Sequence, residues 1–315
     1  MATATEAPAV AGGLVPHTPF QFAPAAKEAR PVRALLDGPP GSGRLTAALR
    51  MAAALGDSIA VIDTERGRSR QYAEEFSFDV AEMTAFDPKD LCLALYAAAA
   101  YDVVIISSWS SFWSGPEGIR DQVAARSGKG SRDTGWDEVR PVERQMLAAV
   151  QCHPGHLIGV LRNRLDVVLA TDLAGRTVPT RVSLRAEQRD GLEYDFDFAA
   201  SMLPSREMLV TKSAAPGLTG EVLTDASALG TQLRTWAQNG IDRAPTAELL
   251  HRAYERGATY EALSELAQEV QLRRAGAMAA VDHEGKLTTL GDLVSFRLSR
   301  AYGRTPQPPA PQGEA

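Results

Sequence analysis

The chain has few of the residues that mark a secreted, membrane-bound or zinc-binding protein. Only two of its 315 residues are cysteines, Cys92 and Cys152, and they do not form a Cys-x-x-Cys pair. The spacing excludes a disulfide framework and a cysteine zinc site, and it is typical of a protein from a reducing compartment. The sequence contains no run of 18 apolar residues and no signal peptide, so we expect no membrane contact and a cytoplasmic location.

Strong positive charge is also missing. The formal net charge is −6, which excludes a histone-like nucleic-acid binder but leaves room for local basic loops. Hydrophobic residues make up 44% of the chain and charged residues 23%. This composition is typical of a globular protein with a sizeable core.

Apolar strand patterns alternate with helix patterns between residues 31 and 240. Strands are predicted at 32–38, 58–65, 78–85, 101–108, 156–162 and 206–212, with a hairpin at 166–182 around the turn 172–175. Helices are predicted at 44–55, 87–100, 142–152 and 225–240. Asp87 suits the N-cap of the second helix with Pro88 at its first position, and Gly240 suits the end of the last helix. The alternation predicts an α/β fold with a mainly parallel sheet covered by helices on both faces.

Composition also divides the chain into segments. Residues 1–30 are rich in alanine and proline and predict a flexible tail, followed by an α/β domain over 31–240. A boundary near 239–246 precedes a small helical module over 245–303, with helices expected at 246–257, 259–270 and 288–302. The proline-rich residues 304–315 predict a second tail.

Residues 35–50, "LLDGPPGSGRLTAALR", are similar to a phosphate-binding loop, whose pattern is Gly, four residues, Gly-Lys and Ser or Thr. Gly38 and Gly43 have this spacing, and with Gly41 and Ser42 they keep the turn whose backbone N–H groups converge on phosphate oxygens. The alternative is a tight strand-to-helix turn without a ligand. The order of strand, loop and helix favours phosphate binding.

The side chains of this loop depart from the pattern. Arg44 stands where the lysine belongs, and Leu45 stands where a hydroxyl would bind magnesium. Thr46 lies about 100° further round the helix, so we do not expect it to take over. A later strand usually ends in a second metal-binding aspartate, but Ser107 occupies that place, and Asp102 precedes the strand at its far end. We therefore expect no metal ligands, poor magnesium binding, and ATP or ADP binding that is weak or lacks efficient hydrolysis.

Several longer stretches resemble a known family. They are "FQFAPAAKEARPVRALLDGPPGSGR", "AVIDTERG", "GWDEVRPVERQML", "QRDGLEYDFD" and "VTKSAAPGLTG". Over residues 18–240 the chain resembles the phage and prophage family of RecA-like AAA family ATPases, which accompany single-strand annealing and recombination functions. The segment containing "TTLGDL" resembles the C-terminal module of actinobacterial members.

The resemblance implies a RecA-type core, ATP with magnesium, action on single-stranded DNA, and an oligomer. The family has Gly-Lys-Thr in the loop and Asp-Ser after the strand, so this chain departs from it at Arg44, Leu45 and Ser107. These departures argue against magnesium binding and hydrolysis.

The resemblance also implies roles for three residues. Glu65 matches the carboxylate that orients the attacking water, and Arg162, followed by Arg164, matches a strand tip that senses the terminal phosphate. Lys212 matches the position from which one subunit reaches its neighbour's nucleotide, which implies a homo-oligomer or a hetero-oligomer with active relatives. For Glu65 the alternative is a carboxylate that caps the next helix. For Arg162 and Arg164 it is a surface ion pair, and for Lys212 it is an ordinary lysine at the end of a strand.

Residues 125–136 are predicted to form a Gly-Ser loop that carries Arg126, Lys129 and Arg132, followed by Trp136. Basic and aromatic side chains together are typical of single-stranded DNA binding, although incidental charge on a loop is the alternative. Three further aromatic residues, which we expect to pack in the core rather than stack on bases, are Trp109, Phe112 and Trp113. His153 and His156 flank a turn and do not form a metal set.

The resulting hypothesis is a degenerate RecA-like P-loop protein of phage-type DNA recombination that binds nucleotide without efficient hydrolysis. Two alternatives stay open: a slow but active DNA-dependent ATPase, and a structural or interaction protein that no longer uses nucleotide.

Overall fold

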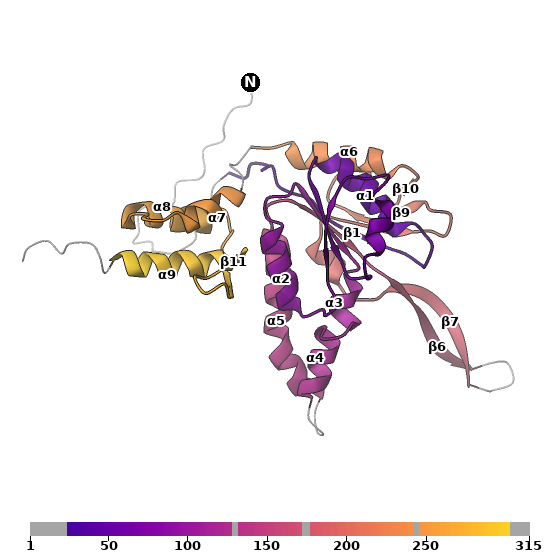
Figure 1. Ribbon diagram of the computed structural model, residues 1–315. Helices are drawn as coiled ribbons and strands as arrows, with labels where there is room; N and C mark the ends of the chain where they lie inside the picture. Colours follow the sequence, from indigo (N-terminus) through magenta and orange to yellow (C-terminus); the bar gives the residue numbers. More distant parts are fainter. Residues whose placement is uncertain (1–23, 128–131, 172–176, 242–245, 303–315) are drawn as a thin grey trace, which may run out of the picture.

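The computed structural model describes residues 24–127, 132–171, 177–241 and 246–302 (Figure 1). Its centre is an eight-stranded mixed sheet with the strand order β10-β9-β8-β1-β5-β4-β2-β3. The strands are β1 (Arg33–Asp37), β2 (Ile59–Asp63), β3 (Asp79–Glu82), β4 (Val103–Ser107), β5 (His156–Val160), β8 (Phe198–Met202), β9 (Met208–Ser213) and β10 (Val222–Leu223). The six strands from β8 to β3 are parallel to their neighbours, whereas β9 and β10 add antiparallel pairs at one edge. The predicted α/β class with a mainly parallel sheet is confirmed.

Strand β8 was not predicted from the sequence. Its residues, "FAASM", are rich in alanine, which is depleted in strands. The strand exists because it fills the place between β1 and β9, where it pairs with both.

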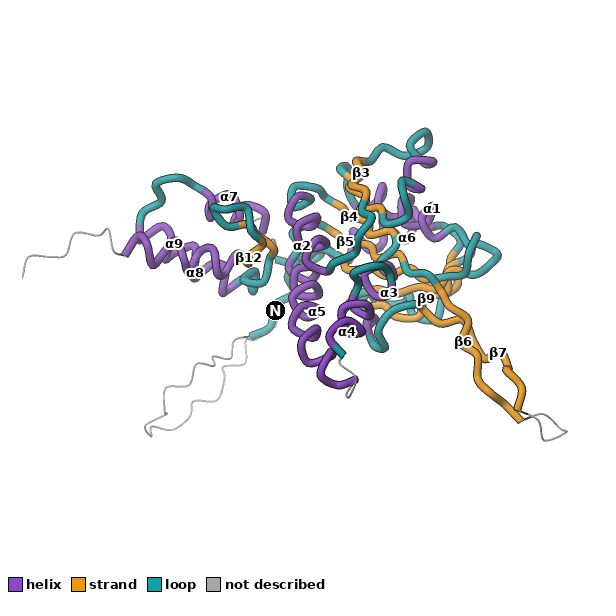
Figure 2. The backbone as a smooth tube through the Cα atoms, turned by 60° about the horizontal axis from the view of Figure 1, so that its bottom comes forward, coloured by secondary structure: helices purple, strands orange, loops and turns teal. Residues whose placement is uncertain are grey.

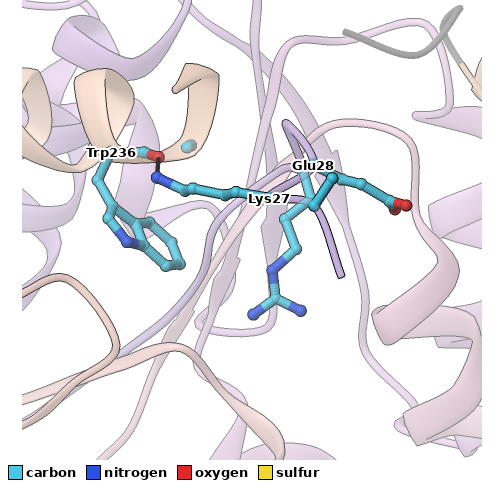
Figure 3. A pocket seen from close by; sticks show the side chains of 6 residues that line it. Lys27, Glu28 and Trp236 are labelled. Atoms are coloured by element: carbon cyan, nitrogen blue, oxygen red, sulfur yellow. Dashed lines mark hydrogen bonds between the residues drawn. The ribbon is translucent and has the colours of Figure 1, made fainter. Parts of the chain in front are cut away.

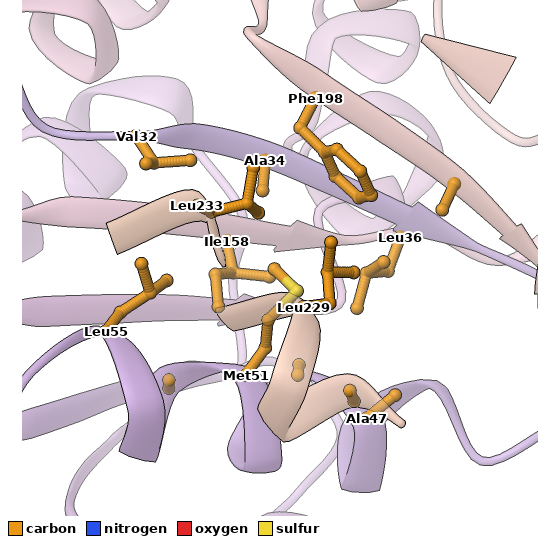
Figure 4. Close-up of a cluster of buried hydrophobic side chains, with 14 of the residues drawn as sticks. Val32, Ala34, Leu36, Ala47, Met51, Leu55, Ile158, Phe198, Leu229 and Leu233 are labelled. Carbon is orange, nitrogen blue, oxygen red and sulfur yellow. The ribbon is translucent and has the colours of Figure 1, made fainter. Parts of the chain in front are cut away.

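Helices cover both faces of the sheet, as predicted. One face is covered by α1 (Arg44–Leu55) and α6 (Ala226–Gln238), and the other by α2 (Pro88–Ala97) and α5 (Arg132–Cys152) (Figure 1). Figure 4 shows Met51 of α1 and Leu229 of α6 meeting Ile158 and Phe198 of the sheet. The two helices of this face approach so closely that a Cβ on Gly230 would lie 2.5 Å from the carbonyl oxygen of Met51.

Local signals set the helix ends. The Asp87 carboxylate accepts a hydrogen bond from the Lys89 N–H at 2.9 Å, which confirms it as the N-cap of α2. Asp225 caps α6 in the same way through Ser227. Helix α6 ends at Gln238 with Asn239 as its C-cap, so Gly240, the expected stop residue, follows the cap directly. Gly240 is needed because a Cβ there would lie 2.7 Å from the backbone of residues 28 and 29.

Between β4 and β5 the described residues form the helices α3 (Ser110–Ser114), α4 (Ile119–Arg126) and α5. Helix α5 begins at Arg132 rather than at residue 142, so most of the expected loop at 125–136 is helical, and Trp136 lies within α5. Residues 128–131 lie outside the described part of the chain. The predicted hairpin is present as β6 (Asn163–Thr171) and β7 (Thr177–Ala186), and it extends away from the sheet, with its expected turn outside the described residues (Figures 1 and 2).

The C-terminal module contains α7 (Thr246–Tyr254), α8 (Tyr260–Leu272), β11 (Ala279–Val281), β12 (Leu287–Thr289) and α9 (Leu290–Tyr302). The three helices were predicted and the two-stranded sheet was not. The module has an apolar core of its own, and it packs beside α2, because Ala279 and Leu287 join the core on that face of the large sheet (Figure 2).

Of the expected N-terminal tail, residues 1–23 lie outside the described part, whereas residues 27–30 pack at the end of α6. The backbone N–H of Ala29 donates to Ile241, and Arg30 donates to Ala237. The Lys27 amine donates to the Trp236 carbonyl at 2.8 Å and lies 5.5 Å from the centre of its ring (Figure 3). Among the described helices, none is both long and apolar enough to cross a membrane.

Candidate functional site at the phosphate loop

Residues 38–43 connect β1, in the middle of the sheet, to the start of α1. A Cβ on Gly38 would lie 2.7 Å from both the Met202 Cβ and the Ser42 Oγ, so no side chain fits there. Gly41 and Gly43 have φ values of 81° and 83°, in the left-handed region that favours glycine. Each of these three positions of the predicted phosphate loop therefore requires or favours glycine.

The loop presents unpaired polar groups. Helix α1 begins after Gly43 with no side-chain cap and no acidic residue in its first turn, which leaves its first N–H groups available to an anion. The Ser42 side chain is 1% exposed, and its hydroxyl has no hydrogen-bond partner among the residues that the structure describes. Buried hydroxyls are almost always hydrogen-bonded, so a phosphate oxygen would satisfy this group.

Arg44 is half-buried, and its guanidinium donates to the Gly38 carbonyl at the opposite end of the loop. Burial lowers the pKa of Arg44, and the neighbouring Arg162 and Arg68 contribute to the lowering. The carboxylates of Glu65 and Asp37 oppose it. Glu65 and Arg162, two of the other predicted site residues, therefore both act on the charge of Arg44.

Asp37 and Asn163 hold the loop through hydrogen bonds, a role that the sequence analysis did not predict. The Asn163 amide donates to an Asp37 carboxylate oxygen at 3.1 Å and accepts from the Gly38 N–H at 3.1 Å. Ser201 donates to the second Asp37 oxygen at 3.0 Å. Burial raises the pKa of Asp37, and these hydrogen bonds counteract the rise. A carboxylate directly before the loop was the available signal, but its partners come from distant strands.

The positions that would bind magnesium do not fit a metal ion. Leu45 is 8% exposed and belongs to the apolar core below α1. Thr46 is half-buried on the next helical position. Ser107 ends β4 and is 2% exposed. The described residues contain no group of three or more His, Cys, Asp or Glu side chains that could hold a metal ion.

Asp102, directly before β4, and Asp63, on its neighbour β2, have hydrogen-bond partners within the chain. Asp102 lies at the far end of β4, as predicted, where it accepts hydrogen bonds from the Ser58 N–H and hydroxyl, which lower its pKa. Asp63 ends β2 beside Ser107 and is 1% exposed. It accepts from the N–H groups of Glu65 and Ser69, and thereby fixes the start of the short helix η1 (Arg68–Tyr72).

Arg162 follows β5 and has partners within the chain. Its backbone N–H donates to the Ser110 hydroxyl oxygen at 3.0 Å, and its side-chain Nε lies 3.4 Å from a Glu187 carboxylate oxygen. Arg164 is exposed. The ion pair with Glu187 is the alternative that the sequence left open for Arg162.

Lys212 does not lie at the loop of its own chain. It pairs with Ala199 near the start of β8, whereas the loop follows the carboxyl ends of the strands. Its amine donates to the carbonyls of Glu193 and Phe196 at 2.7 and 2.6 Å, around the short helix η2 (Leu192–Asp195). A role at a neighbouring subunit stays a prediction.

Arg206 is a basic residue near the loop that sequence reasoning missed. It lies in the turn between β8 and β9 with a φ of 70°, unusual for a residue other than glycine. A Cβ on Gly43 would lie 3.8 Å from its Cγ and Cδ, so its side chain runs past the start of α1.

The expected DNA-binding residues are only partly described. Arg126 ends α4 and lies 3.6 Å from a Glu138 carboxylate oxygen. Lys129 lies outside the described residues, and Arg132 is placed only by its backbone, at the start of α5. The aromatic residues Trp109 and Phe112 are 3% and 0% exposed, so they pack in the core as expected and cannot stack on bases.

Trp113 and Trp136 form a half-buried ring pair with centres 5.9 Å apart. His153 and His156 serve the packing of β1 and β5: their Nδ1 atoms accept from the N–H groups of Gly155 and Val32 at 3.1 and 2.9 Å.

No protein-family model and no curated protein sequence matches the chain.

Proposed function

We propose that this chain is a RecA-like P-loop protein that binds the phosphates of ATP or ADP without magnesium and without efficient hydrolysis. The observation that carries the proposal is the combination of three positions within residues 38–43 that require or favour glycine with a buried Leu45 and Ser107 at the two metal-binding positions. The parallel strand order β3-β2-β4-β5-β1, with the loop directly after β1, supports the RecA-like assignment.

Arginine side chains would supply the positive charge that magnesium normally gives. Arg68 and Arg162 help to lower the pKa of Arg44, and the Arg206 side chain runs past the start of α1. One guanidinium group can donate two parallel hydrogen bonds to two phosphate oxygens, and it stays charged at any physiological pH. A site of this kind binds a polyphosphate without requiring a divalent cation.

The biological part of the proposal is action on single-stranded DNA in phage-type recombination, as a homo-oligomer or with active relatives. It depends on the family resemblance of the stretches around Gly38, Glu65 and Lys212. The basic residues Arg126, Lys129 and Arg132 are the proposed DNA contacts.

Nucleotide binding measured by calorimetry, in magnesium and in EDTA, tests the site. We expect ATP to bind equally well in both. Arg44→Ala should weaken binding about tenfold or more, because a charge-assisted contact contributes about 1.5–3 kcal/mol. The matched control is Arg50→Ala, since Arg50 is exposed on the same helix and pairs with Glu75 at 3.3 Å.

Phosphate release with and without single-stranded DNA separates the alternatives. DNA-stimulated release at an ordinary ATPase rate would establish the slow but active enzyme instead. If the chain binds neither nucleotide nor DNA, the remaining alternative is a structural or interaction protein that no longer uses nucleotide.

A further inference from the structure

The C-terminal module contains a groove that the nucleotide proposal does not use. It has a volume of about 750 Å³ and lies between the end of α7, the start of α8, the β11–β12 turn and α9. Its base is apolar, formed by the buried side chains of Ala253, Leu263 and Leu293.

Aromatic rings line the sides of the groove. Phe296 is 46% exposed and stacks on His283, with ring centres 5.8 Å apart and an angle of 7° between the planes. Tyr260 also lines the groove and contacts Tyr302, which follows on α9, at 5.6 Å between ring centres. The Arg300 guanidinium also lies over the Phe296 ring, 5.6 Å from its centre, and Tyr260 is half-buried. Grooves lined by aromatic rings receive proline-rich segments in the extended polyproline II conformation.

The charges of the groove argue against a nucleic acid. Arg297 donates to the carbonyls of Ala253 and Glu255 and is committed to the end of α7. The lining has three arginines, Arg297 included, against two carboxylates, Glu261 and Asp282, so its formal net charge is only +1. A phosphate backbone needs a net positive path, whereas an uncharged peptide does not.

The chain itself carries a segment of matching chemistry. The sequence directly after Tyr302 is "GRTPQPPAPQGEA", with Pro306, Pro308, Pro309 and Pro311. Two Pro-x-x-Pro pairs result, and a period of three residues places the members of each pair on one face of a polyproline II helix. Eight such residues span about 25 Å at about 3.1 Å each, enough to return along a 13-residue helix of about 20 Å.

We propose that the groove beside Phe296 is a binding site for a proline-rich peptide, and that it takes residues 305–312 of the same molecule. Attachment at Gly303 supports this occupant, because a binding segment joined to its site through a few residues has an effective concentration in the millimolar range. The proposal is independent of the nucleotide site.

Photo-cross-linking in the full-length protein tests the proposal. Phe296 is replaced by p-benzoylphenylalanine, and the cross-linked peptides are identified by mass spectrometry. We expect cross-links to residues 305–312 within one chain, and about a tenfold lower yield when the four prolines are changed to serine. The matched control places the same probe at Leu272, which is 73% exposed and about 18 Å further along α8 than Tyr260, and should give no cross-link to the segment.

Three results would overturn the proposal. The first is a yield at Phe296 that does not depend on the prolines. The second is a cross-link that joins two chains. The third is suppression of the cross-link by single-stranded DNA but not by an added peptide of residues 304–315.

Discussion

Replacing Ser107, at the end of β4, by aspartate tests whether the position that would bind a metal ion is shielded from water. Ser107 is 2% exposed, and its register partner on the neighbouring parallel strand is Asp63, which is 1% exposed. Register partners point to the same face of a sheet and adjacent strands are about 4.8 Å apart, so Ser107→Asp would place two carboxylates about 6 Å apart. At an effective dielectric constant of about 20, their repulsion is about 3 kcal/mol.

We therefore expect Ser107→Asp to lower the free energy of unfolding by about 3 kcal/mol in EDTA at neutral pH. The control is Ser107→Asn, which has the same shape without the charge. Urea unfolding followed by tryptophan fluorescence measures both variants. In the double variant with Leu45→Thr, magnesium should recover part of the loss, because the two ligands that the site lacks are then present. Equal stability of the Asp and Asn variants would refute the reasoning, because it would mean that the site is open to water.

Three further predictions follow from buried groups. Burial lowers the pKa values of His153 and His156 to about 4 from 6.5, so the unfolded chain binds more protons between these pH values. The free energy of unfolding should fall by up to about 3 kcal/mol for each histidine as the pH drops from 6.5 to 4. His153→Asn should remove about half of that dependence in acid titrations of stability. Gly230→Ala should cost about 1–3 kcal/mol in urea unfolding, because its Cβ would lie 2.5 Å from a carbonyl oxygen of α1, whereas Gly276→Ala, which meets nothing within 4 Å, should cost little. Lys212→Met should lower the free energy of unfolding by about 1–3 kcal/mol and leave nucleotide affinity unchanged; a loss of affinity at constant stability would instead assign Lys212 to a neighbour's site.

The parts of the fold that the sequence predicts are those with strong local signals. Asp87 and Pro88 mark the start of α2, and the apolar run at 103–107 is β4. Strand β8 and the helical course of residues 132–141 carry no such signal: the first is rich in alanine, and the second contains Gly135 and Pro141. Their structure is decided by packing between distant segments, which a local pattern does not contain.

The same division applies to the site. The spacing of Gly38 and Gly43 was enough to predict the loop, because the geometry of such a loop is a local property of the backbone. The roles of Asn163 and Arg206 were not predictable, because they reach the loop from β6 and from the turn after β8. Only the strand order brings these residues to the carboxyl end of β1.

The most direct test of the central claim is the affinity of the purified chain for ATP with magnesium and with excess EDTA, measured together with phosphate release. The account predicts the same dissociation constant in both buffers and no release above background, with or without single-stranded DNA. Binding that requires magnesium, accompanied by DNA-stimulated release, would contradict it.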